Sequence, residues 1–134
     1  MIKIPARIRY ALRTLVELAK NERVVVPLSL IEKNQMISAK FAKQILQPLE
    51  RAHVVSSRRG VKGGYRLNKD PAKIHLIDIF RCFDEEFTVS PCLSADLECG
   101  RAADCEARPI WEELSLQITD FFTDRSLADL LPPK

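Results

Sequence analysis

VVSSRRGVKGGYRL, residues 54–67, is the stretch of sequence that decides the fold. Two short runs of β-prone residues flank a basic tip, which contains three of the chain's four glycines. Glycine permits the backbone angles and the close approaches that a tight turn requires. The stretch therefore predicts a β-hairpin with a positively charged tip at which Arg58, Arg59 and Lys62 would meet a polyanion.

Two short helices are predicted before this hairpin, over residues 28–34 and from Ser38 onward, with a tight connection between them. Ser38 is a favourable N-cap, and apolar residues at three- and four-residue spacing follow it. Pro48 lies inside this pattern and predicts a kink or an early end near residue 47, because proline removes a backbone hydrogen bond. The open face of the second helix presents Ser38, Ala39, Lys40, Lys43 and Gln44.

An amphipathic helix is predicted in the first 20 residues, where Pro5 suits the first turn. Its apolar stripe consists of Ile8, Ala11, Leu12, Leu15, Val16 and Ala19. Arg7, Arg9, Arg13, Glu17 and Lys20 fall mostly on the other side. A short extended piece at residues 24–26 follows and is ended by Pro27.

The order of these elements, a helix pair followed by a basic hairpin, is that of a winged helix-turn-helix. Such a fold reads the DNA major groove with the first turns of its second helix, where Lys and Gln can pair with base edges. A single exposed lysine is more often only solvated, so the prediction depends on the combination of elements. Tyr10 and Tyr65 are either DNA contacts or wall residues of the core.

Charge divides the chain into two parts. Residues 1–75 hold 16 Lys or Arg against 5 Asp or Glu, whereas residues 76–134 hold 5 against 13. Clustered cations gain free energy by displacing counterions from nucleic-acid phosphates. We therefore expect a DNA-binding domain at residues 1–75, and a second domain at residues 76–134 that carries a cysteine loop and a dimerisation helix.

Residues 84 to about 104 lack helical or strand periodicity. This segment and the residue directly after it contain three of the four cysteines, Cys92, Cys99 and Cys105. Thiolates are soft ligands that select zinc, copper(I) or iron–sulfur clusters. The spacing is wide for a zinc knuckle and suits a loop around a 2Fe-2S or 4Fe-4S cluster. Unrelated loop cysteines are the alternative. Cys82, in a short helix ending near residue 83, is interpreted as a small hydrophobic residue.

The last long helix is predicted to end near Asp124, and Ser126 would cap a final turn. Its apolar stripe is wide for a chain of this size, which predicts a twofold dimer that places two hairpins and two reading helices on one palindromic site. The stripe consists of Ile110, Trp111, Leu114, Ile118, Phe121 and Phe122.

A family resemblance covers nearly the whole chain. It rests on Arg9-Tyr10-Ala11, Pro27-Leu28, Ile37-Ser38, Gln44, Val55-Ser56-Ser57-Arg58-Arg59-Gly60 with Gly63-Gly64-Tyr65, the three-cysteine loop, and Trp111 before an amphipathic helix. Together these residues resemble the Rrf family of winged-helix transcription regulators (IscR-, NsrR-, RirA- and CymR-like).

The resemblance implies a homodimer with a recognition helix around Ser38 to Gln44 and a wing on DNA, which adds Gly60, Gly63, Gly64 and Tyr65 to the candidate DNA-binding residues. In cluster-binding members the three loop cysteines hold an iron–sulfur cluster that controls DNA affinity. The familiar fourth ligands are replaced here by Arg108 and Arg9, so Glu106, Asp104, Glu98 or Cys82 would substitute, or the site would be open. Lys43 stands where IscR-like proteins carry a glutamate that affects site choice.

Two other functions are compatible with the sequence. The same DNA-binding regulator could lack a cluster and sense thiols, a metabolite or a partner protein, and a small iron–sulfur carrier is a more distant alternative. An enzyme is not expected, because His53 and His75 are the only histidines and no nucleophile or phosphate-loop motif is present. Arg7, Arg9 and Arg13 argue against an export segment, and no apolar run is long enough for a bilayer. We expect a cytoplasmic protein without a membrane partner.

Overall fold

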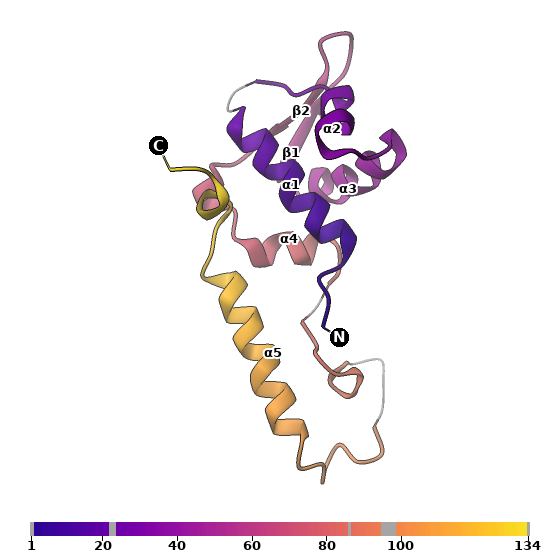
Figure 1. The fold of residues 1–134 in the computed structure, drawn as a ribbon, viewed down its shortest axis with the longest axis vertical. Helices are drawn as coiled ribbons and strands as arrows, with labels where there is room; N and C mark the ends of the chain where they lie inside the picture. The colour runs from indigo at the N-terminus through magenta and orange to yellow at the C-terminus, as the bar shows by residue number, and fades with distance from the viewer. Residues whose placement is uncertain (1, 22–23, 86, 95–98, 134) are drawn as a thin grey trace.

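Five helices and one β-hairpin form the part of the chain that the computed structural model describes, residues 2–21, 24–85, 87–94 and 99–133 (Figure 1). The elements are α1 (Ala6–Lys20), α2 (Leu28–Gln35), α3 (Ala39–Arg51), β1 (Val55–Arg58), β2 (Gly64–Leu67), α4 (Leu76–Cys82) and α5 (Arg108–Thr123), with 3-10 turns η1 (Pro71–Lys73), η2 (Pro91–Leu93) and η3 (Leu127–Leu130). This confirms the predicted mainly helical winged helix-turn-helix with a long C-terminal helix. In Figure 1 α5 extends away from the other elements.

The turn between α2 and α3 is built as the sequence predicts. Met36 ends α2 in the left-handed conformation, with φ of 56°. Ser38 then caps α3, because its Oγ accepts a hydrogen bond from the backbone N–H of Phe41 at 3.1 Å. These two local signals fix where the second helix starts.

Of the two outcomes predicted from Pro48, the early end of α3 near residue 47 is wrong, and the kink stays a prediction. The helix passes through Pro48 and continues to Arg51. Pro48 lies in the last turn, so the lost hydrogen bond affects only the end of the helix, and the complete burial of Leu49 holds that turn in place. His53 adopts a left-handed conformation just beyond the helix, with φ of 60°.

A third extended segment joins the hairpin. β1 and β2 pair antiparallel, with Val55 opposite Leu67, and Val26 forms an isolated bridge to Tyr65. In this bridge the N–H of each residue donates to the carbonyl of the other, and both N···O distances are 2.8 Å. Gly64 permits this approach, since a Cβ on it would lie 2.1 Å from the Val26 carbonyl oxygen.

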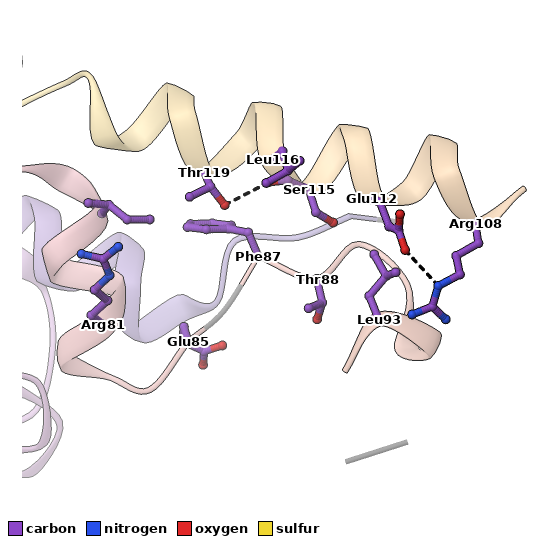
Figure 2. Close-up of a pocket in the computed structure, with 11 residues that line it drawn as sticks. Arg81, Glu85, Phe87, Thr88, Leu93, Arg108, Glu112, Ser115, Leu116 and Thr119 are labelled. Atoms are coloured by element: carbon purple, nitrogen blue, oxygen red, sulfur yellow. Dashed lines mark hydrogen bonds and ion pairs between the residues drawn. The ribbon is translucent and has the colours of Figure 1, made fainter. Parts of the chain in front are cut away.

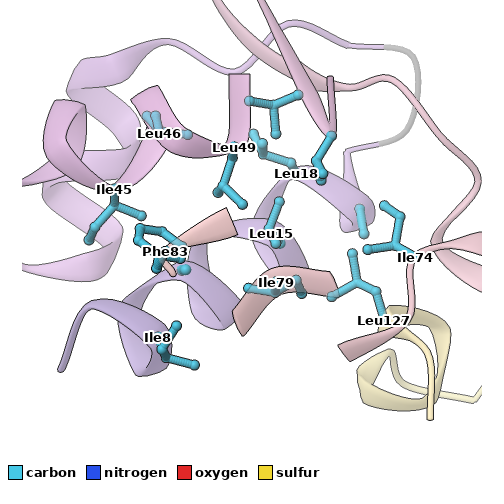
Figure 3. Close-up of a cluster of buried hydrophobic side chains, with 14 of the residues drawn as sticks. Ile8, Leu15, Leu18, Ile45, Leu46, Leu49, Ile74, Ile79, Phe83 and Leu127 are labelled. Carbon is cyan, nitrogen blue, oxygen red and sulfur yellow. The ribbon is translucent and has the colours of Figure 1, made fainter. Parts of the chain in front are cut away.

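One hydrophobic core lies between the helices and the base of the hairpin (Figure 3). It draws on residues from both sides of position 75, including Leu15 of α1, Ile79 of α4 and Leu127 of η3, each 0% exposed. The last residues return to the core because His75 bridges to Ser126, and the Leu127 N–H donates to the Ile74 carbonyl at 2.8 Å. The division of the chain at residue 75 stays a prediction.

Glu17 departs from its predicted place on the polar side of α1. It is 8% exposed, and its carboxylate accepts hydrogen bonds from the side-chain amides of Asn34 and Gln35. A buried carboxylate is stable only when such donors surround it. These bonds attach the end of α2 to α1 and so fix the start of the turn into α3.

Among the described residues, no helix has the length and apolar character needed to cross a membrane.

Replacing Gly64 by alanine should destabilise the protein, because the new methyl group would collide with the Val26 backbone and Gly64 has φ of +154°. We expect the free energy of unfolding to fall by about 2 kcal/mol or more. Urea denaturation followed by circular dichroism measures this. Gly100→Ala is the matched control, because a Cβ there meets no atom within 4 Å. Equal stability of the two variants would contradict the close-packing argument.

Candidate functional site: a nucleic-acid interface and a cysteine segment

The first turns of α3 present the side chains that the sequence singles out. Ser38, Lys40, Lys43 and Gln44 are exposed and Ala39 is half-buried, whereas Ala42 and Ile45 on the other side are 1% exposed. Phe41 packs against Tyr10 of α1, with ring centroids 5.4 Å apart. The helix is thus fixed from behind, and its polar face is open to a partner.

The hairpin tip exposes the predicted basic residues Arg58, Arg59 and Lys62. Two glycines shape it: Gly60 has φ of +107°, and a Cβ on Gly63 would lie 2.2 Å from the Arg58 carbonyl oxygen. These glycines therefore have a structural role in the tip, and direct contact with DNA stays a prediction for them.

Tyr65 is half-buried and packs against the core, as does Tyr10. Burial, followed by the nearby Glu50 carboxylate, raises the pKa of the Tyr65 phenol. Glu50 also accepts a hydrogen bond from Ser57 Oγ at 2.6 Å, which ties the end of α3 to β1. The recognition helix and the hairpin are therefore connected directly.

The charges on this face are not neutralised by ion pairs within the described part of the chain. The ion pairs found there involve Arg7, Arg81, Arg101 and Arg108. The lysines of α3 and the arginines of the hairpin thus remain available to an external polyanion.

Residues 87–93 form a segment that runs beside α5 and carries Cys92, and this segment is called the strap below. Phe87 lies 4.2 Å from Phe80 and 5.1 Å from Phe122, measured between ring centroids. The Val89 N–H donates to Ser115 Oγ at 3.3 Å, and Arg108 Nη1 donates to the Cys92 carbonyl at 3.1 Å. The sequence reading missed this strap, because a single aromatic residue in an aperiodic segment gives no recognisable pattern.

A cavity of about 640 Å³ is lined by residues of α4, α5 and the strap (Figure 2). Phe87 and Leu93 of the strap line it together with Arg108 and Glu112 of α5, which form an ion pair at 2.9 Å. Arg108 therefore binds both the Glu112 carboxylate of its own helix and the backbone of the Cys92 turn. The cavity's charged groups already have partners, since Glu85 pairs with Arg7 of α1.

The four cysteines are free thiols and differ in their surroundings. Cys92 Sγ lies 3.1 Å from Ser90 Oγ, Cys99 is exposed, and Cys105 is half-buried. Among the described residues, no three His, Cys, Asp or Glu side chains are gathered as a metal site. The predicted ligand Glu98 lies outside the described residues. Cys82 is half-buried against the core, as predicted for a small hydrophobic side chain.

The fold and the exposed basic face define a winged helix-turn-helix protein of the DNA-binding class. A family model described as an iron-dependent transcriptional regulator, Rrf2, matches residues 4–133. The chain belongs to the Rrf2 family of transcriptional regulators. This confirms the resemblance seen in the sequence and the expectation that the protein is not an enzyme.

Individual relatives agree. A candidate HTH-type transcriptional regulator of Aquifex aeolicus (strain VF5) is 36% identical over 126 residues, covering 92% of this chain and 88% of that protein. The HTH-type transcriptional regulator IscR of Vibrio vulnificus (strain YJ016) is 30% identical over 131 residues, covering 97% and 77%.

Among solved structures, CymR (YrzC), the global cysteine regulator of B. subtilis, superposes with a TM-score of 0.80 at 28% identity, covering 97% of this chain and 96% of that one. T. potens IscR superposes with a TM-score of 0.75 at 25% identity, covering 96% and 85%. The chain is therefore similar both to IscR and to a regulator named for cysteine.

Cys82 should react slowly with iodoacetamide at about pH 8. Burial, and then the Asp78 carboxylate, raise the pKa of its thiol, so a smaller fraction is thiolate at that pH. The exposed Cys99 should be alkylated first, as followed by mass spectrometry of peptides. Raising the pH or replacing Asp78 by Asn should accelerate the Cys82 reaction. Equal rates for Cys82 in the folded and the urea-unfolded chain would contradict this.

Proposed function

We propose that this Rrf2-family regulator acts in the cytoplasm as a homodimer on palindromic double-stranded DNA, and that the state of Cys92, Cys99 and Cys105 controls its affinity. The observation that carries the DNA-binding part is the open, basic face formed by α3 and the hairpin tip. Lys40, Lys43 and Gln44 would read the major groove, and Arg58, Arg59 and Lys62 would lie on the flanking backbone or in the minor groove.

Dimerisation through α5 is supported by the exposure of its apolar residues. No residue of this 16-residue helix is buried, and Ile110, Trp111, Leu116 and Phe121 are between 39% and 64% exposed. A second copy that covers this surface would remove it from water, which is the strongest driving force available to such a helix. The same pairing would place two α3 helices on one palindromic site.

An iron–sulfur cluster is supported by the chemistry of the donors. Three thiols within one segment form a soft donor set, and a bound cluster would supply redox-sensitive chemistry there. Among the described residues these thiols form no group of three possible metal ligands, so binding would require the segment to rearrange. Arg108 attaches the Cys92 turn to the start of α5. A change of order in the segment would thereby reach the dimerisation helix.

Thiol sensing without a cluster is the second candidate. It is favoured by the absence of a group of three possible metal ligands among the described residues and by the exposure of Cys99, which would make that thiol accessible to oxidants. Similarity to a regulator named for cysteine is compatible with this alternative.

Binding to DNA should be strong at low salt and steeply salt-dependent. A 30-base-pair duplex, selected from a random library with the wild-type protein, should bind two chains and lose on the order of a thousandfold in affinity between about 50 and about 200 mM KCl. Replacing both Lys40 and Lys43 by Gln should weaken binding by about tenfold or more. Fluorescence anisotropy measures both effects. A protein that selects no duplex would refute the DNA-binding role.

Visible absorbance after anaerobic reconstitution with iron and sulfide distinguishes the two sensing candidates. We expect a coloured wild-type protein, and loss of the absorbance in the Cys92→Ala, Cys99→Ala and Cys105→Ala variants, because each removes one donor. Cys82→Ala is the control and should stay coloured. Iron, sulfide and zinc are quantified in parallel. A colourless wild type that still binds DNA would exclude the cluster and favour thiol sensing.

A further inference from the structure

We propose that Ser56 and Arg66, on the outer face of the hairpin, bind a DNA backbone phosphate together with Arg58, which lies at the edge of the tip. The inference rests on the proposed DNA-binding function and adds a second contact surface to it. Arg66 and Ser56 are not among the residues that the sequence pattern points to as DNA contacts.

The register of the hairpin separates its two faces. Val55 pairs with Leu67 and Ser57 with Tyr65, and these pairs face the core side, where Val55 is 1% exposed. Side chains alternate along a strand, so Ser56, its partner Arg66, and Arg58 point away from the core. Both arginines are exposed. The outer face of the hairpin is therefore built around two guanidinium groups.

These groups line a hollow of about 380 Å³ whose walls are Val25, Ser56, Ser57, Arg58 and Arg66. Arg66 Nε donates to Ser56 Oγ at 3.4 Å, which orients the guanidinium over the sheet and leaves its terminal N–H groups for another acceptor. The site thus combines a positioned guanidinium, a second one nearby and the Ser56 hydroxyl.

The charge of this hollow favours an anion. Within the described part of the chain, no carboxylate forms an ion pair with Arg58 or Arg66. Glu50 lies on the opposite face, where it accepts from Ser57. Guanidinium groups match the geometry of phosphate oxygens and form charge-assisted hydrogen bonds with them. A phosphodiester therefore matches the hollow in its charge and in the kind of donor group that lines it.

Because Arg66 lies close to the hairpin tip, we expect the phosphate that it binds to belong to the DNA backbone. Arg66 lies two residues from Gly64, at the base of the tip, which is about 7 Å along a strand. A tip in the minor groove would therefore bring the outer face toward the backbone next to that groove. Each hairpin of the dimer would contact an additional phosphate on the outer side of its half-site.

The test measures the slope of log affinity against log salt concentration for Arg66→Gln in the full-length protein on the selected 30-base-pair duplex. Each lost phosphate contact should lower the magnitude of the slope by about 1, so about 2 for a dimer with two hairpins. Arg58→Gln should act in the same direction. Arg81→Gln on α4 is the matched control, because that side chain is also exposed, at 67%, and carries the same charge.

Three outcomes can be told apart. A lower slope for Arg66→Gln than for Arg81→Gln, with weakened protection of the outermost phosphates in a hydroxyl-radical footprint, supports the inference. A slope and footprint equal to those of Arg81→Gln overturn it while leaving DNA binding intact. A wild type that selects no duplex removes the proposed function itself. Thermal denaturation of both variants verifies that the exposed substitutions leave the fold unchanged.

Discussion

The paired backbone hydrogen bonds between Val26 and Tyr65 are the constraint on which the winged helix-turn-helix part of the molecule depends. They attach the hairpin to the link between α1 and α2, so the wing has a fixed direction relative to the helix pair. Gly64 is required there because any side chain would separate the two backbones. The bond between Ser57 and Glu50 adds a second connection, from the hairpin to the end of α3. If α3 and the hairpin contact one duplex as proposed, they would do so without first being ordered, which would limit the entropy lost on binding.

Helix α5 is likewise attached to the rest of the molecule at both of its ends. Its C-terminal end is held by the pairing of His75 with Ser126 and by Leu127 in the core, whereas its N-terminal end contacts the cysteine segment through Arg108. The 16 residues between these ends span about 24 Å. A helix is stiff over this length, so a displacement at the cysteine end changes the angle at which α5 leaves the core. In a dimer formed through this helix, that angle would set the spacing of the two reading heads.

Sequence patterns predicted the parts of the fold that depend on local physics. Apolar periodicity located the helices, Ser38 marked the start of α3, and the glycines marked the hairpin. The errors arose where tertiary contacts override local preference. Pro48 was expected to kink α3 or to end it early, and burial of Leu49 carries the helix past it to Arg51. Glu17 was expected on the polar side, but amides from a different helix make its burial possible. No pattern within one segment contains that information.

For the cysteine segment, the sequence gives the spacing of the thiols and the structure gives their contacts. Spacing indicates that three thiols lie within reach of one another along the chain, and the strap shows that one of them, Cys92, has its backbone fixed to α5 by Arg108. Cys99 is exposed, and among the described residues it shares no metal site with the others. A ligand that needs all three thiols must therefore rearrange the segment around the fixed Cys92 turn. The free energy of that rearrangement would couple ligand binding to the position of α5, because Arg108 belongs both to the strap contact and to the first turn of the helix.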